Sequence, residues 1–262
     1  GLGFADGPCT DAEGNFYYSD MPGPGAGIYR ISPDGQKSKL SDEGVSGIKL
    51  YRGGNIIIAC QGSKKRVFAL DLDSGRIDVL ATNVQPNDLT VSAKGHIYFT
   101  ETGKKQVSWI DASRGFTSFP FEVKAADTGI TAPNGITLSP DQGTLAVSDY
   151  RGGNVWTFRV ESDGSLTAKE PYMTLRRPID PKGEFKFNQP PPYKPESGGD
   201  GMCSDEQGRY YVTSALGVQI FDPTGRECGL LPKLHSDKPL TSCTLSGPDR
   251  SYLYITHGER IY

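Results

Sequence analysis

The chain has 262 residues, 33 of them glycine and 19 proline, and a formal net charge of −3 at pH 7. This charge is small and unclustered, which gives no electrostatic footprint for nucleic acid or for an anionic membrane. No apolar run approaches the ~18 residues that cross a bilayer. We therefore predict a soluble protein, and the sequence leaves its compartment, cytoplasmic or periplasmic, and its oligomeric state open.

Short hairpins with one turn pattern recur along the chain. In the clearest copy, strands are predicted at 135–139 and 144–149, on either side of the turn residues Pro140-Asp141-Gln142-Gly143. The copies begin, in chain order, at Asp6, Ser46, Asn87, Asn134, Asp200 and Ser242. These starts are 40, 41, 47, 66 and 42 residues apart, which is the spacing of four-stranded propeller blades.

Weaker strand pairs lie between the copies, for example 66–72 with 77–81 and 154–160 with 166–172. A lone hairpin cannot bury its apolar face, so the copies should pack on one another. We predict an all-β, six-bladed β-propeller that forms a single domain over residues 1–262. The alternative, a sandwich of six hairpins, would not require one turn pattern repeated in phase.

The two ends of the chain bear on how the ring closes. By comparison with residues 78–82 ahead of Asn87, an outer strand is expected several residues upstream of Asp6. The last hairpin is followed only by a third strand, which ends at 259–262. Because propellers avoid an open edge, we interpret the N-terminus as trimmed and expect the missing strand to close the ring.

The repeat brings two sets of polar residues into phase. The first set stands at the entry to each innermost strand: Asp6, Ser46, Asn87, Asn134, Asp200 and Ser242. The second set ends the following strand and returns to the same face: Asp20, Cys60, Glu101, Asp149, Ser214 and His257. Turn chemistry explains any single member, but together they predict two rings around one mouth of the central channel.

Four members of the first ring carry the donors of a metal site. Asp6, Asn87, Asn134 and Asp200 converge on the channel axis in this arrangement. Two unpaired carboxylates in a cavity repel each other and resist ionisation, and one divalent cation removes that repulsion. Because the donors are carboxylate and amide oxygens, we favour Ca²⁺ and then Mg²⁺, with Mn²⁺ and Zn²⁺ as the remaining options.

The motifs around these positions resemble a known family. They are Asp6-Gly7-Pro8, Pro86-Asn87-Asp88, Pro133-Asn134-Gly135, Asp200-Gly201-Met202 and the final Leu253-Tyr254-Ile255-Thr256. Through them, and over essentially its whole length, the chain resembles the SMP-30/gluconolactonase/regucalcin-like propellers. The resemblance implies one metal on the axis, usually Ca²⁺, held or approached by the four residues above, and hydrolysis of a lactone or related ester.

Two positions depart from the family pattern. Asp6 stands where the family usually has glutamate, and it is shorter by one C–C bond of about 1.5 Å. The ion would then be bound through water, drawn off centre or held more weakly. Gln85 stands where animal sugar-lactonases carry arginine, so specificity for aldonolactones does not transfer with the resemblance.

The predicted function is metal-dependent lactone hydrolysis of the gluconolactonase type, on a sugar lactone or related cyclic ester. The metal polarises the carbonyl, Asp200 acts as general base or nucleophile, and Asn87 orients the substrate oxygen. Candidates for substrate contact or for support of the metal ligands are Asp20, Asp88, Glu101, Asp149, His257, Arg176 and Arg177. The alternatives are a phosphotriesterase using the same site and a non-catalytic ligand-binding propeller with structural Ca²⁺.

The connection between the fourth and fifth copies contains a Pro-rich, basic and aromatic insertion at residues 176–199. Long connections of this kind are either disordered surface loops or lids over a functional site. The insertion leads directly into Asp200, so we consider it a candidate lid. In that role Phe185, Phe187 and Tyr193 would wall a pocket, and Arg176 and Arg177 would suit an anionic or polyhydroxylated substrate.

Overall fold

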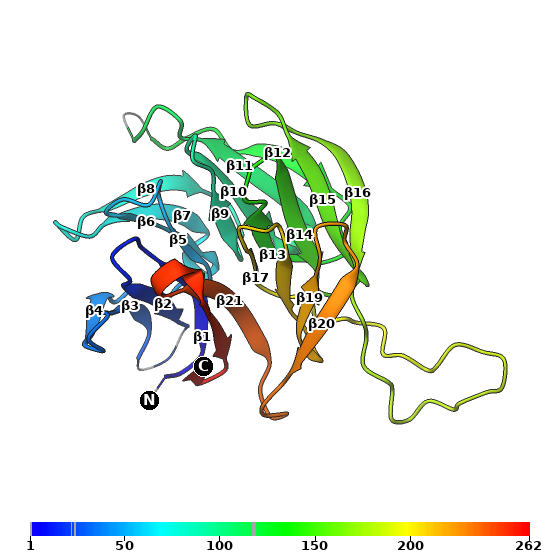
Figure 1. Cartoon of the computed structure of the whole chain (residues 1–262). Coiled ribbons are helices and arrows are strands. Elements are labelled where there is room, and N and C mark those ends of the chain that lie inside the picture. Colours follow the sequence, from blue (N-terminus) through cyan, green and yellow to red (C-terminus); the bar gives the residue numbers. More distant parts are fainter. Residues whose placement is uncertain (1, 22, 24, 117–118) are drawn as a thin grey trace.

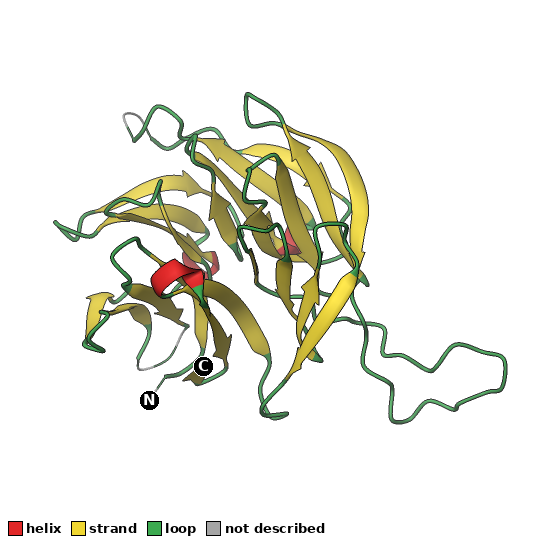
Figure 2. Ribbon diagram, in the orientation of Figure 1, coloured by secondary structure: helices red, strands yellow, loops and turns green. Residues whose placement is uncertain are grey.

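The computed structural model describes residues 2–21, 23, 25–116 and 119–262. Within these residues almost all regular structure is β, and the strands form six antiparallel sheets. The sheets stand side by side around a central axis as the blades of a propeller, as Figures 1 and 2 show. The predicted fold is therefore confirmed.

Each blade is a meander whose first strand is innermost. The first three blades consist of β1 (Ala5–Thr10), β2 (Phe16–Asp20), β3 (Gly27–Ile31) and β4 (Lys37–Ser41); β5 (Ile48–Leu50), β6 (Ile56–Gln61), β7 (Arg66–Asp71) and β8 (Ile77–Thr82); and β9 (Leu89–Val91), β10 (His96–Glu101), β11 (Gln106–Asp111) and β12 (Lys124–Thr128). Three-residue 3₁₀ turns follow β6 and β10, at Gly62–Lys64 and Thr102–Lys104.

The last three blades follow the same plan. They consist of β13 (Pro133–Leu138), β14 (Thr144–Asp149), β15 (Asn154–Val160) and β16 (Leu166–Thr174); β17 (Met202–Ser204), β18 (Tyr210–Thr213), β19 (Gly217–Phe221) and β20 (Glu227–Pro232); and β21 (Leu240–Ser246), β22 (Tyr252–His257) and β23 (Arg260–Ile261). A 3₁₀ turn at Pro248–Arg250 lies between β21 and β22. No helix in the described part of the chain has the length and apolar character of a membrane span.

The hydrophobic core lies between neighbouring blades. Ile58 of β6 and Val67 of β7 pack with Leu89, Ile97 and Phe99 of the next blade, and all are fully buried. Similar clusters fill the spaces between most other neighbouring blades. The second strands are therefore covered on both faces, which explains why β10 is buried at all six positions although it alternates only weakly.

The first and last blades meet to complete the ring. The backbone N–H of Ala5 donates to the carbonyl of Gly258 over 2.8 Å. The rings of Phe16 and Tyr254 lie 4.8 Å apart, centroid to centroid. The last sheet has three strands within the described residues. A fourth strand supplied from upstream stays a prediction.

Glycine lets the innermost strands approach one another closely at one level. A Cβ atom at Gly135 in β13 would lie 2.1 Å from the carbonyl oxygen of Asp200 in the next blade. Neither backbone can retreat, because each is also held in its own sheet. Gly7, Gly47 and Gly201 occupy the same level, and a Cβ atom at these positions would lie 2.2 to 2.7 Å from its nearest neighbour. The sequence motifs thus carry glycine for packing around the axis.

We expect Gly135→Ala to lower the free energy of unfolding by about 1–3 kcal/mol or more, because the added methyl group overpacks two backbones. Chemical denaturation with intrinsic fluorescence would measure the change. Gly153→Ala is the matched control, since a Cβ there meets nothing within 4 Å. Equal stability of the two variants would contradict the close-packing interpretation.

Candidate active site

The first predicted ring is present, with one change of register. Asp6, Ser46, Asn87, Asn134 and Asp200 stand at the entry to their inner strands and are partly exposed. In the sixth blade the prediction of Ser242 is wrong. Ser242 pairs with Thr256 and lies against Gly201, one level deeper, so Thr241 occupies the ring position. The last hairpin, from Thr241 to His257, is two residues longer than the one from Asp6 to Asp20, with one extra residue on each side of the turn, and the sequence alignment allowed for only one of them.

A belt of hydroxyl groups holds this ring together. A Ser or Thr near the end of each of several second strands donates to the carbonyl of the ring residue in the next blade. The donor–acceptor pairs are Ser19–Ser46 (3.0 Å), Thr100–Asn134 (2.6 Å), Ser148–Asp200 (3.0 Å) and Thr213–Thr241 (3.3 Å). These bonds cross from blade to blade at the level of the ring, so they fix the spacing of its side chains.

Three carboxyl groups gather on the axis, and each has a raised pKa. Burial, followed by the charge of Asp88, raises the pKa of Asp6 to about 8. Burial, and then the charges of Asp6 and Asp88, raise the pKa of Asp200 well above its usual range. Burial also raises the pKa of Asp88, while the nearby Lys49 ammonium lowers it. The three groups therefore cannot all ionise easily without a cation.

The donors of the ring have unused hydrogen-bonding capacity. Oδ1 of Asp6 accepts the backbone N–H of Gly7 at 2.8 Å, and Oδ1 of Asp200 accepts that of Gly201 at 2.9 Å. Within the described residues, the side-chain amides of Asn87 and Asn134 have no hydrogen-bond partner. In the same part of the chain, no three His, Cys, Asp or Glu side chains form a metal-binding group. The candidate site therefore includes the two amides, and carboxylate and amide oxygens suit a hard divalent cation.

Sequence reasoning missed Lys49 and placed Asp88 only among supporting residues. Asp88 lies at the level where other inner strands carry glycine, and its Oδ1 is 2.7 Å from the Cβ position of Gly47. Lys49 lies in the neighbouring strand β5, and its Nζ donates to the carbonyl of Pro8 at 3.1 Å. The sequence signal for Asp88 was a carboxylate at a position where other copies of the repeat have glycine.

The carboxylates of the second ring are buried and bind backbone N–H groups. Asp20 accepts from Gly3 and Phe4, Glu101 accepts from Gln85, and Asp149 accepts from Thr131 and Ala132, at distances from 2.7 to 3.1 Å. Glu101 also pairs with Lys104 at 2.7 Å. Each carboxylate thereby anchors the segment that enters its own inner strand. Their direct contact with substrate stays a prediction.

His257 lies in a small aromatic group at the end of β22. Its Nε2 is 2.9 Å from the carbonyl of Lys238. Its ring lies 6.0 Å from that of His235 and 5.9 Å from that of Tyr262. His235 lies in the connection between the fifth and sixth blades. The structure shows that this connection folds back against β22. A role of His257 at the substrate stays a prediction.

The insertion at 176–199 forms an arm that extends away from the propeller, as Figure 1 shows between β16 and β17. Phe187 is 94% exposed and Phe185 is 71% exposed. The prediction that these aromatic residues wall a pocket is therefore wrong for this conformation. The arm pairs mainly with itself, through Asp180 N–H to Pro192 and Lys194 N–H to Pro178, and this pairing directs it outward.

Both arginines expected at the substrate lie at the base of the arm. Arg176 pairs with Glu227 of the outer strand β20 at 2.5 Å. The guanidinium of Arg177 lies 5.9 Å from the ring centroid of Tyr193. An outer strand is the part of a blade farthest from the axis, so Arg176 is directed away from the ring of Asp6 and Asp200. Their roles in substrate binding stay predictions.

Replacing residues 179–193 with a short Gly-Ser bridge is expected to leave the free energy of unfolding nearly unchanged, because the hydrogen bonds of the arm are internal. The replacement keeps Ser197, which is buried and donates to the carbonyl of Asp149 at 3.1 Å. If the arm acts as a lid, kcat/KM falls for a bulky lactone and stays the same for a small one. Equal values for both substrates before and after the replacement would contradict the lid.

The chain matches a family model over residues 4–259, and the model is described as the SMP-30/gluconolactonase/LRE-like region. The chain belongs to this family. Its curated relatives include the gluconolactonase of Zymomonas mobilis subsp. mobilis. That protein is 27% identical over 290 residues, which cover 98% of this chain and 77% of the relative.

Solved structures of family-like propellers show the same fold. A gluconolactonase from Xanthomonas campestris aligns with a TM-score of 0.77 at 21% identity, over 99% of this chain and 85% of that one. A calcium-binding regucalcin from Agrobacterium tumefaciens aligns with a TM-score of 0.73 at 16% identity, over 97% and 82% of the two chains. At these identities the likeness establishes the shared propeller fold.

Proposed function

We propose that this family member is a lactonase that uses one divalent cation, with Ca²⁺ as the first candidate. The observation that carries the proposal is the axial ring, in which the carboxyl groups of Asp6 and Asp200 have raised pKa values. The unpartnered amides of Asn87 and Asn134 complete the donor set. The names of the relatives support it: gluconolactonase for two and calcium-binding protein for the third.

A cation held by these four side chains would supply Lewis-acid polarisation of the substrate carbonyl. The remaining chemistry falls to the chain itself. The free Oδ2 of Asp200 takes a proton from the attacking water, since Oδ1 already accepts the Gly201 N–H. The water oxygen bonds to the carbonyl carbon and the ring C–O bond breaks. The same proton then passes from Asp200 to the leaving ring oxygen, which yields a hydroxy acid.

Other residues at this mouth would orient the substrate. The Nδ2 group of Asn87 is free to donate to a substrate oxygen. Tyr150 is half-buried and lies near Asp200. Burial and then the charge of Asp200 raise the pKa of its phenol. Gln85 is exposed and lies beside Gly103, where it can contact substrate hydroxyls. Specificity would then depend on loops around a fixed centre.

The test is turnover of a panel of δ- and γ-lactones, sugar lactones among them, and of one organophosphate triester. Metal is first removed on a chelating resin, and Ca²⁺, Mg²⁺, Mn²⁺ and Zn²⁺ are then added back singly. We expect lactone hydrolysis that metal removal abolishes and one of these ions restores. Calorimetry should show a single divalent site.

The panel also separates the alternatives. Hydrolysis of the triester without any lactone would favour a phosphotriesterase. Metal binding without turnover of any substrate would favour a ligand-binding propeller with a structural ion. Full lactonase activity in the metal-free protein would contradict the role of the cation.

A further inference from the structure

A cavity opens at the end of the central channel opposite the ring of Asp6 and Asp200. Its volume is about 510 Å³, and its lining comes from all six inner strands, near the end of each. The ring of Asp6 and Asp200 lies at the beginning of the same strands. Three residues of extended chain separate the two levels, which is roughly 10 Å. The cavity is thus a site distinct from the candidate active site.

One level of the repeat forms the wall of this cavity. The side chains at that level, three residues beyond the ring, are Cys9, Lys49, Thr90, Thr137, Cys203 and Thr244. Ser139, Ser204 and Gln142 add further polar groups at the rim. The lining is therefore mostly polar, which does not suit an apolar ligand.

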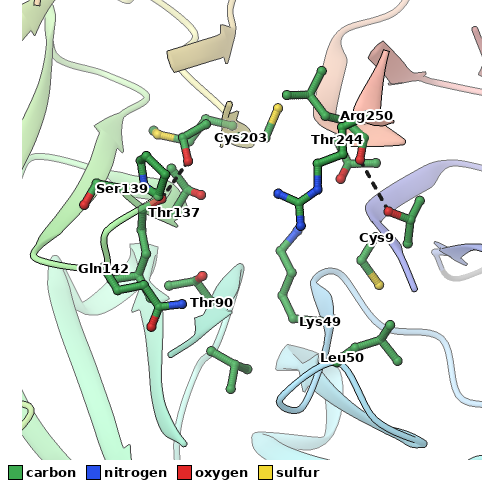
Figure 3. Close-up of a pocket in the computed structure, with 18 of the residues that line it drawn as sticks. Cys9, Lys49, Leu50, Thr90, Thr137, Ser139, Gln142, Cys203, Thr244 and Arg250 are labelled. Atoms are coloured by element: carbon green, nitrogen blue, oxygen red, sulfur yellow. Dashed lines mark hydrogen bonds between the residues drawn. The ribbon is translucent and has the colours of Figure 1, made fainter. Parts of the chain in front are cut away.

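Two cationic side chains meet inside the cavity. Figure 3 shows Lys49 and Arg250 extending from opposite sides toward one another. Within the described part of the chain, neither forms an ion pair with a carboxylate, although Glu206 also lines the cavity. Lys49 also lies near the axial carboxyl groups of Asp6 and Asp88, but nothing of this kind lies beside Arg250 in the described residues. An anion between the two cations would relieve their mutual repulsion.

The backbone at Arg250 is unusual and directs its side chain. Asp249 and Arg250 both adopt left-handed conformations, with φ of 58° and 50°. Consecutive residues of this kind are strained for side chains other than glycine, and such strain is concentrated at functional sites. This turn between β21 and β22 brings the guanidinium over the channel.

Hydroxyl groups without partners surround the two cations. Among the residues that the structure describes, the side chains of Thr90, Thr137 and Thr244 make no hydrogen bond, and Figure 3 shows all three around the cavity. These hydroxyls can donate to an anion or accept from a hydroxylated ligand. The volume is in the range of small-molecule sites and exceeds what a bare phosphate needs.

We propose that this cavity binds a small hydroxylated organic anion, a carboxylate or a phosphate ester. Its charged group lies between Lys49 and Arg250, and its hydroxyls contact the threonines. A cation is disfavoured by the two positive side chains. The proposal does not depend on the lactonase activity, because none of the residues that carry it is a proposed metal ligand or takes part in the proposed proton transfer.

Calorimetry on the metal-free protein tests the proposal with three probes of one carbon skeleton: gluconate, glucose 6-phosphate and neutral glucose. Without metal, the ring of Asp6 and Asp200 offers no cation that could bind these anions at the other mouth. We expect saturable binding of at least one anion and much weaker binding of glucose. Lys49→Gln and Arg250→Gln should each weaken anion binding by at least about tenfold.

Lys186→Gln is the matched control, since Lys186 is an exposed cation on the arm, and it should bind as the parent protein does. Lys49 also faces the axial carboxylates, so the exposed Arg250 carries the test if Lys49→Gln does not fold. Binding of only one anion supports the proposal and selects the carboxylate or the phosphate ester. Glucose binding as tight as the anions, affinity unchanged in Arg250→Gln, or no saturable binding would overturn it.

Discussion

Asp200→Asn is expected to reduce kcat/KM for a lactone by on the order of 10³-fold and to weaken divalent-metal binding by on the order of 100-fold or more. The substitution keeps the shape of the side chain and the oxygen that accepts the Gly201 N–H. It removes both a negative ligand and the group that takes a proton from water. Steady-state kinetics and calorimetry with Ca²⁺ would measure the two effects.

Asp149→Asn provides the contrast, because the Asp149 carboxylate accepts backbone N–H groups of Thr131 and Ala132. We expect this variant to lose stability while its metal affinity stays within a few-fold of the parent. Equal loss of metal affinity in both variants would show that the two rings act as one site. Unchanged affinity in Asp200→Asn would remove Asp200 from the ligand set.

In the metal-free protein, the free energy of unfolding is expected to fall as the pH rises from about 4 to about 8. The pKa of Asp6 is about 8 in the folded state, against an ordinary value of 3.8 for an aspartate, and the pKa of Asp200 is also raised. A carboxyl group whose pKa is raised in the folded state makes its full contribution to stability only below the pKa that it has in the unfolded state. This contribution is lost as the pH rises through the folded value. With ~1.4 kcal/mol for each pKa unit, the loss is on the order of a few kcal/mol.

Urea denaturation at pH 4.5, 6, 7.5 and 9 would follow this loss in metal-free protein. Saturating Ca²⁺ should remove most of the decline above pH 7, because the ion binds the ionised carboxylates. Asp6→Asn should flatten the profile of the metal-free protein. A stability that rises over this pH range without metal would show that the axial carboxyl groups are not held as the structure indicates.

The repeat made the fold and the ring predictable. One turn pattern, repeated at blade spacing, placed Asp6, Asn87, Asn134 and Asp200 at equivalent positions, and they occupy equivalent positions in the structure. This works because a propeller converts equal sequence phase into equal height along one axis. The height of a residue along the axis therefore follows from its position in the repeat, without knowledge of any loop.

What the sequence could not predict depends on length changes and on long side chains. An extra residue in the inner strand of the last hairpin places Thr241, and not Ser242, in the ring. Lys49 lies three residues beyond the ring residue of its own strand, but its long side chain reaches the surroundings of Asp88 and Asp6. The position of a residue in the repeat does not reveal such a reach. The direction of the 176–199 arm follows from its internal pairing, such as Ile179 with Tyr193, which carries no periodic signal.

The hydroxyl belt that links one blade to the next has a consequence for how such propellers diversify. The belt bonds join side chains of strand ends to backbone carbonyls, so they do not depend on the connections outside the ring. The height and spacing of the ring side chains then depend on the propeller as a whole. Loops at the rim can be lengthened, shortened or exchanged while the ring keeps its dimensions. An insertion as long as residues 176–199 can therefore be accommodated between Ser148 and Asp200, whose hydrogen bond still joins the fourth and fifth blades.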